Sequence, residues 1–306
     1  MKMEKITIVG MGALGVMYGD FLVRKLGKEH VEFVANKKRI DKYNKEGVFC
    51  NGHKCDFTVV DEELQGEPAD LLIFAVKATG LEEAIKTVRN KVSENTIIMS
   101  VLNGISSEDI IGRVYGMDKI IHCIVQAMDT TKIENEVRYS QFGHFCLGID
   151  EKNEDKKRRL KAVLDLFDKV DMPYILEDNI RRRVWSKFML NVGLNQSVMI
   201  HEGTYATVQK SGKARELMKD AMSEVMRLAQ MENINLTQKD FDAYIELVDQ
   251  MNPNGMPSMR QDGLQKRKSE VELFAGTVIK LADKHRIDVP VNRKIYETVL
   301  KMEEEY

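Results

Sequence analysis

The stretch ITIVGMGALG, residues 6–15, decides the fold. Its first four residues form a short apolar run typical of a strand. Gly10, Gly12 and Gly15 then give the pattern GxGxxG, and a helical pattern follows. This order predicts a dinucleotide-binding turn, in which the backbone approaches a pyrophosphate and the helix N-terminus faces its charge. The alternative is a glycine-rich turn with a structural role only. The predicted loop contacts come from Gly10, Gly12, Ala13, Leu14 and Gly15.

Strand-like runs and helical patterns alternate downstream of this turn. Residues 30–35, 69–77 and 96–104 form apolar runs, and residues 81–92 have helical spacing. Such alternation predicts an α/β fold with a Rossmann-type, doubly wound parallel sheet.

The pattern changes twice in the rest of the chain. Residues 119–149 are short β-like runs with turns, and residues 153–170 form a charged amphipathic helix pattern. Nearly all of the later sequence is helix-like, including one long amphipathic segment over residues 270–285. We therefore predict a Rossmann domain over residues 1–177 and an all-α domain over residues 178–306.

Composition excludes several classes of protein. The chain has 306 residues, 43% of them hydrophobic and 31% charged, with a net charge of −2. This balance gives no basic field for nucleic acid, and no apolar run approaches the ~20 residues that cross a bilayer. The N-terminal MKMEK passes straight into the first strand, and the four cysteines lack CxxC spacing. We therefore expect a cytoplasmic protein with reduced thiols.

The end of the second predicted strand bears on the cofactor. An Asp or Glu there usually accepts a hydrogen bond from the ribose 2′-hydroxyl of NAD. Here Asn36 is followed by Lys37, Lys38 and Arg39, which suit a 2′-phosphate. The pattern favours NADPH over NADH, with an ordinary basic helix start as the alternative.

A polar stripe crosses the apolar stretch WSKFMLNVGLNQS, residues 185–197. Lys187, Asn191 and Asn195 recur at every fourth position, so they share one helix face. A buried lysine without a partner costs several kcal/mol, so the stripe is either solvated or directed at a polar group. In a reductase, Lys187 could protonate the oxygen of the carbonyl being reduced. A solvated surface lysine beside two packing amides is the alternative.

Further motifs make a family recognisable. VKA at residues 76–78, NG at 103–104, WSKFMLNVGLN at 185–195, PSMRQD at 257–262 and SEVE at 269–272 follow GxGxxG in order. In this the chain resembles the ketopantoate reductase (2-dehydropantoate 2-reductase) family over essentially its whole length.

The resemblance implies an enzyme that reduces the 2-keto acid 2-dehydropantoate to (R)-pantoate with NADPH, on the way to pantothenate. It also implies a homodimer with a helical domain for substrate and dimerisation. The implied roles are catalysis for Lys187 and Glu270, substrate binding for Asn191, Asn195 and Ser258, and cofactor binding for Asn36, Lys37, Lys77 and Asn103. Structural alternatives remain: a surface cation for Lys77, a helix cap for Ser258 and a helix-start residue for Glu270.

The chain departs from the family pattern in three places. The family often has Arg at the position of Asn36, Gln at that of Leu102, and small residues where His122 and Cys123 stand. These departures motivate a second hypothesis, a D-2-hydroxyacid dehydrogenase of the same family, whose members act on bulkier 2-keto acids and in some cases use NADH. A third is a non-catalytic NADP(H) sensor.

The segment CNGHKC, residues 50–55, places two thiols near His53. Such a group can bind a metal, but the central Asn-Gly favours a hairpin turn. We therefore predict a hairpin and no metal site.

Overall fold

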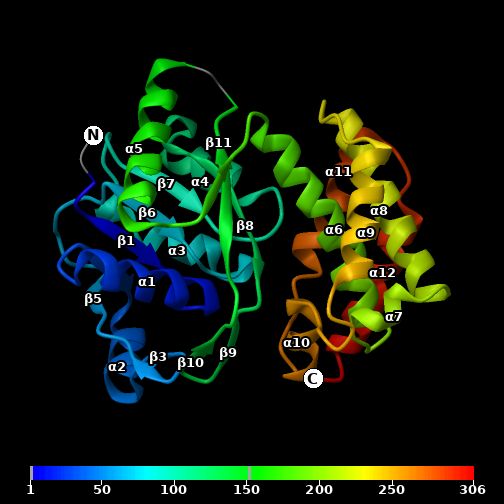
Figure 1. Cartoon of the computed structure of the whole chain (residues 1–306), viewed down its shortest axis with the longest axis horizontal. Helices are drawn as coiled ribbons and strands as arrows, with labels where there is room; N and C mark the ends of the chain where they lie inside the picture. The colour runs from blue at the N-terminus through cyan, green and yellow to red at the C-terminus, as the bar shows by residue number, and fades with distance from the viewer. Residues whose placement is uncertain (1–2, 151–152) are drawn as a thin grey trace. The chain divides into compact units, whose positions relative to one another are not determined.

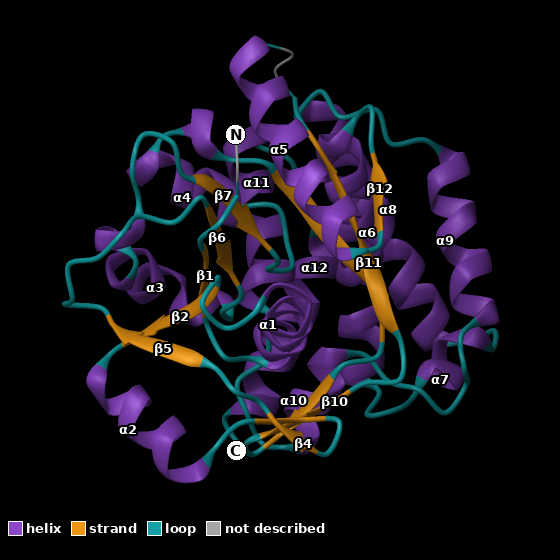
Figure 2. Cartoon of the chain, turned by 60° about the vertical axis from the view of Figure 1, so that its left-hand side comes forward, coloured by secondary structure: helices purple, strands orange, loops and turns teal. Residues whose placement is uncertain are grey.

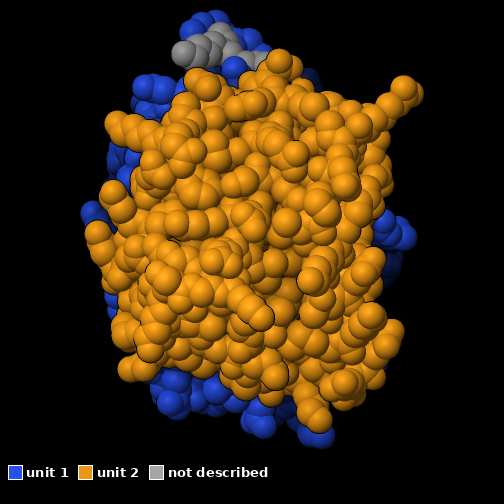
Figure 3. All heavy atoms as spheres, turned by 90° about the vertical axis from the view of Figure 1, so that its right-hand side faces the viewer, with its two compact units in different colours: residues 1–180 blue, residues 181–306 orange. Residues whose placement is uncertain are grey.

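The computed structural model describes residues 3–150 and 153–306 and divides the chain into two compact units. The first ends at Ile180 and the second begins at Arg181 (Figure 3). This division lies close to the predicted boundary at residue 177.

A five-stranded parallel sheet forms the centre of the first unit (Figure 1). Its strand order is β5-β2-β1-β6-β7. The strands that follow β1 are added on one side of it as far as β5 and on the other side from β6, so the topological switch point lies between β1 and β6. In open α/β sheets, ligands bind outside the carboxyl ends of the strands at such a switch point. The strands are β1 (Ile6–Val9), β2 (Val31–Ala35), β5 (Thr58–Asp61), β6 (Leu71–Phe74) and β7 (Ile97–Ser100).

Helices cover both faces of this sheet because strand side chains alternate in direction. Ile6 and Ile8 of β1 pack in one core cluster with α1 and α5, whereas Val9 packs in another with α3 and α4. The prediction of a doubly wound sheet is therefore confirmed. The helices are α1 (Ala13–Leu26), α3 (Leu81–Thr87), α4 (Ser107–Tyr115) and α5 (Glu154–Val170), with α2 (Lys37–Glu46) after β2.

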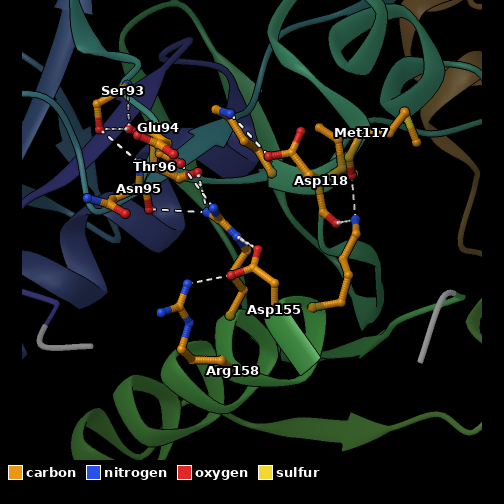
Figure 4. A network of polar contacts seen from close by, with 12 residues as sticks. Ser93, Glu94, Asn95, Thr96, Met117, Asp118, Asp155 and Arg158 are labelled. Carbon is orange, nitrogen blue, oxygen red and sulfur yellow. Dashed lines mark hydrogen bonds and ion pairs between the residues drawn. The ribbon is translucent and has the colours of Figure 1, made fainter. Parts of the chain in front are cut away.

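A buried arginine, Arg159, connects α5 to the segment just before β7, and Figure 4 shows its partners Glu94, Asn95, Thr96 and Asp155. The Arg159 guanidinium donates hydrogen bonds to the carbonyl oxygens of Glu94, Asn95 and Thr96, at 3.0–3.3 Å. Its Nε donates to Asp155 at 2.7 Å, one turn earlier on the same helix. The buried charge is thus paired and its donors are used, which is the condition for burying an arginine.

Two smaller sheets complete the first unit (Figure 2). One has the order β4-β3-β10-β9, and the other has the order β12-β11-β8. The predicted hairpin is confirmed: Cys50 pairs with His53 across an Asn51-Gly52 turn whose φ angles are 45° and 84°. Their strands are β3 (Phe49–Cys50), β4 (His53–Lys54), β8 (His122–Met128), β9 (Thr131–Ile133), β10 (Glu136–Arg138), β11 (Phe142–Gly148) and β12 (Tyr174–Leu176).

The second unit is helical, as the sequence predicts. Residues 270–285 differ from expectation, because the segment opens with a π-helix over Glu272–Gly276 before α11 (Thr277–His285) begins. None of the described helices is both long and apolar enough to span a membrane. The remaining helices are α6 (Ile180–Ile200), α7 (Tyr205–Gln209), α8 (Lys213–Met231), α9 (Gln238–Gln250), α10 (Ser258–Leu264) and α12 (Pro290–Glu303).

Candidate functional site

The glycine loop joins β1 to α1 in a conformation that requires glycine. Gly10 has a φ of 104°, and a Cβ there would lie 2.6 Å from the carbonyl oxygen of Ala75, just after β6. A Cβ on Gly15 would lie 2.0 Å from the carbonyl oxygen of Gly10. The loop therefore packs directly on the strand across the switch point and keeps the helix close to the sheet.

The first turn of α1 has the chemistry of an anion site. Gly12 is the N-cap of α1 and has no side chain with which to cap that turn. The N–H groups of Ala13 and Leu14 belong to the helix start, where no intrahelical acceptor exists. With the glycine cradle beside them, these groups fit the pyrophosphate of a dinucleotide.

Lys132 of β9, which no local sequence pattern singles out, adds a cation at this loop. Its Nζ donates a hydrogen bond to the carbonyl oxygen of Met11, between two of the loop glycines. Burial lowers the pKa of Lys132, and the nearby Lys42 lowers it further. A contact across 121 positions of sequence carries no local signal.

The structure brings a carboxylate to the end of β2. The Asn36 side chain caps α2 by accepting from the Arg39 N–H at 3.0 Å, and it donates to Glu83 of α3 at 3.3 Å. Arg39 also lies 3.5 Å from Glu83. Lys37 and Lys38 are exposed. The predicted cationic cluster thus contains an acidic residue from 47 positions further along the chain.

Two further predicted cofactor residues follow strands of the same sheet. Lys77 comes shortly after β6 and is exposed, while Asn103 comes shortly after β7 and is half-buried. Because the strands are parallel, both lie at the edge that carries the glycine loop. The topology therefore brings Gly10, Lys77 and Asn103 to one edge.

A buried carboxyl, Glu108, follows Asn103 in the chain, in the first turn of α4. The Ser100 hydroxyl donates to Ser107 at 2.8 Å, and Ser107 donates to Glu108 at 2.7 Å. Burial raises the pKa of Glu108 to about 7, against the hydrogen bond from Ser107, which lowers it. The Cys123 thiol donates to the Ser100 carbonyl oxygen at 3.1 Å, so this residue belongs to the same buried group.

The second unit carries the lysine stripe on α6. Every residue from Val184 to Met199 is buried except Lys187, which is half-buried. Asn191 and Asn195 are 8% and 6% exposed. The stripe is therefore not a solvated helix face, and polar groups must satisfy it.

Gln196, next to Asn195, connects α6 to the segment that follows Glu270. Its side-chain oxygen accepts from the Ala275 N–H at 3.0 Å, and its amide donates to the Val192 carbonyl oxygen at 2.7 Å. The Gly276 N–H bonds to the carbonyl oxygen of Val271, five residues earlier, as in a π-helix. Gln196 thus takes a donor inside the π-turn and explains why the predicted α-helix is interrupted there.

The other two predicted residues lie at segment starts in this unit. Ser258 is the first residue of α10 and is exposed, and the N-cap position is Pro257. Glu270 is half-buried, and its carbonyl oxygen accepts from Leu273 and Phe274. The backbone N–H of the adjacent Ser269 donates a hydrogen bond to the Glu303 carboxylate at 2.8 Å.

The parallel sheet, its strand order and the glycine loop after its first strand define a Rossmann-type protein with a helical C-terminal unit. The family model described as Ketopantoate reductase PanE/ApbA matches residues 6–151, and the model of its C-terminal part matches residues 179–303. The chain belongs to the ketopantoate reductase family of oxidoreductases, which confirms the resemblance.

Individual relatives are distant but cover the full length. The 2-dehydropantoate 2-reductase of Aquifex aeolicus (strain VF5) is 26% identical over 301 residues, 96% of this chain and 96% of the relative. The PanE/ApbA family ketopantoate reductase from Ralstonia eutropha JMP134 has a TM-score of 0.84 at 22% identity, covering 98% and 99% of the two chains. D-mandelate dehydrogenase with NADH and anilino(oxo)acetate has a TM-score of 0.86 at the same identity and coverage. These likenesses confirm the fold.

Proposed function

We propose that this chain reduces 2-dehydropantoate to (R)-pantoate, a step toward pantothenate, with NADPH as the hydride donor. The polar stripe on α6 carries the proposal. It sets one half-buried ammonium group beside two buried amides on an otherwise buried helix. A reductase needs such a group because the carbonyl oxygen must gain a proton as it becomes a hydroxyl.

Each residue of the second unit has a role in this proposal. Bound NADPH supplies the hydride, and Lys187 donates a proton from Nζ to the oxygen of the substrate ketone. Asn191, Asn195 and Ser258 orient the carboxylate and hydroxyl groups of the substrate, and Glu270 supports the lysine. A positioned general acid contributes roughly 10²–10⁴ in rate.

The test compares Lys187→Ala with Lys239→Ala, which removes an exposed lysine from the same unit. Oxidation of NADPH is followed by absorbance with 2-dehydropantoate as substrate. Lys187→Ala should lose at least about 100-fold in kcat and still bind NADPH, whereas Lys239→Ala should behave like the wild type. Wild-type turnover by Lys187→Ala would refute the general-acid role.

The proposed NADPH contacts divide into two groups. The glycine loop with Lys132 holds the pyrophosphate, and Lys37 with Arg39 holds the 2′-phosphate. Lys77 and Asn103 contact the cofactor from the ends of their strands. Glu83 competes for Arg39 at 3.5 Å. Glu83→Gln should therefore raise the ratio of kcat/KM for NADPH to kcat/KM for NADH. An unchanged ratio would refute the proposed contact between Arg39 and the 2′-phosphate.

The same carboxylate favours a second candidate. Glu83 next to Asn36 could accept from the ribose hydroxyls of NADH, and the half-buried His122, 3.8 Å from Asp150, replaces a small residue of the family pattern. Both features suit a D-2-hydroxyacid dehydrogenase of this family acting on a bulkier 2-keto acid. Faster turnover of such an acid with NADH than of 2-dehydropantoate with NADPH would select it. Tight NADPH binding without turnover of any 2-keto acid would select the sensor.

We also propose a homodimer, supported by a dimeric ketopantoate reductase from Staphylococcus aureus with a TM-score of 0.80 and 20% identity. The chain has a mass of 35.1 kDa. Light scattering on the eluting protein should therefore give about twice that mass at micromolar concentration, and a single-chain mass would refute the dimer.

A further inference from the structure

Four side chains with metal-binding atoms converge beside the small β3–β4 hairpin. Asp20 of α1, His53 and Cys55 each place one ligand atom within 4.8 Å of the others. Cys50, which pairs with His53 across the hairpin, is the fourth candidate ligand. Asp20, Cys50 and Cys55 are buried, while 45% of the His53 side chain is exposed. The group therefore has a dry interior and one entrance.

Hairpin register explains why three of these residues face the same way. Cys50 pairs with His53, and the Cys55 N–H continues the ladder by bonding to the Val48 carbonyl oxygen at 2.8 Å. Cross-strand partners lie on one face, and residues two apart on a strand return to that face. Cys50, His53 and Cys55 therefore share the face toward α1, which supplies Asp20.

In contrast to the expectation from the sequence, which was a hairpin without a metal, we propose that Asp20, Cys50, His53 and Cys55 form a site for one divalent cation of the zinc class. Two thiolates, an imidazole and a carboxylate are the ligand types that Zn²⁺ prefers, in tetrahedral geometry. Bond lengths of about 2.0–2.3 Å place such ligand atoms about 3.3–3.8 Å apart. The ligand atoms of Asp20, His53 and Cys55 lie within 4.8 Å of one another and need only small side-chain movements to reach that spacing, whereas the Cys50 thiol must turn toward them.

Charge balance supports a cation at this position. One Zn²⁺ and the Arg24 guanidinium together balance two thiolates and the Asp20 carboxylate. Arg24 lies 2.9 Å from Asp20 Oδ2 but is not aligned for a hydrogen bond with it. The His53 Nε2 lies 3.0 Å from Asp20 Oδ1, so imidazole and carboxylate already face each other. A bound cation would pin the hairpin to α1, the helix that begins at the glycine loop.

A disulfide between Cys50 and Cys55 is the other chemistry that two neighbouring thiols allow. It fits this register poorly, because Cys50 and Cys55 are diagonal neighbours rather than directly opposed. Diagonal side chains have Cβ atoms well beyond the ~3.5–4.5 Å of a disulfide. Two diagonal thiolates can nevertheless both reach one ion between them.

Cobalt titration tests the site directly. Reduced, untagged protein freed of metal by chelation is titrated with Co²⁺ and then with Zn²⁺. Wild-type protein should bind one equivalent with thiolate-to-cobalt charge-transfer absorption and tetrahedral d–d bands, and Zn²⁺ should abolish both. Cys55→Ser should weaken binding by at least about 100-fold, because even groups that only support a ligand cost 10–100-fold. Cys146→Ser, which removes a buried thiol of β11, should bind like the wild type.

Variant folding is checked by circular dichroism. If Cys55→Ser fails to fold, cobalt binding by His53→Ala is the deciding measurement. The histidine side chain is 45% exposed, so its removal leaves the core intact. Weakened cobalt binding by His53→Ala supports the site, and unchanged binding overturns it. Absence of the charge-transfer band in reduced wild-type protein, or a Cys50–Cys55 disulfide in protein purified without oxidant, also overturns it. None of these readings depends on catalytic activity.

Discussion

Glu108 should make the stability of the first unit depend on pH. Burial raises the pKa of this carboxyl to about 7 from its usual 4.5. In the unfolded chain the group ionises near its usual value, so rising pH stabilises the unfolded state first. The contribution of Glu108 to folding is therefore present in full below about pH 4.5 and is lost as pH rises through 7. A difference of about 2.5 pH units at 1.36 kcal/mol each amounts to about 3 kcal/mol.

The measurement compares wild type with Glu108→Gln, an uncharged residue of the same shape. Urea unfolding is followed by circular dichroism at intervals from pH 4.5 to pH 8. The free energy of unfolding of the wild type should fall relative to the variant by about 3 kcal/mol between pH 4.5 and about pH 7 and then stay level up to pH 8. Glu67→Gln, which removes an exposed carboxylate, should show no such trend relative to wild type.

A difference between wild type and Glu108→Gln that stays constant with pH would refute the reasoning. So would a difference in the opposite direction, with the wild type gaining relative stability as pH rises. Either result would mean that Glu108 is ionised in the folded protein, stabilised by the Ser107 hydroxyl that donates to it.

Three more substitutions have defined outcomes. Gly15→Ala should reduce NADPH affinity by at least about 100-fold by calorimetry, because its Cβ would meet the Gly10 carbonyl oxygen at 2.0 Å. Gln196→Leu should lower the free energy of unfolding by about 1–3 kcal/mol in urea, because the buried Ala275 N–H loses its acceptor. Glu224→Ala should cost about 3 kcal/mol in the same assay, since it removes three hydrogen bonds at the start of α12; no loss of stability would show that water replaces the carboxylate.

Local patterns were enough to predict the strand–turn–helix at Gly10, the hairpin at Asn51 and the helix with a polar stripe around Lys187. In each case the signal lies within about ten residues of sequence. The chemistry of a turn or a helix face depends on neighbours at fixed spacing, so it can be read directly.

Long-range partners had no comparable signal. Lys132 reaches the glycine loop, Glu83 reaches Asn36 and Asp20 reaches His53 only because the sheets bring distant segments together. The prediction of one uninterrupted α-helix over residues 270–285 was wrong for the same reason. Residues 270–285 have the spacing of an α-helix, and Gln196 on another element interrupts it.

The pairing of β3 with β10 has a consequence for synthesis. Phe49 and Cys50 pair with Glu136 and Val137, so one edge of the early hairpin has no partner until the later strand leaves the ribosome. β12, at residues 174–176, completes the neighbouring sheet later still. During this interval the nascent chain exposes unpaired strand edges, which attract other chains. The Rossmann-type unit should therefore pair all of its strands only after nearly all of its 180 residues have been synthesised. A fragment that ends near residue 120 should aggregate and precipitate.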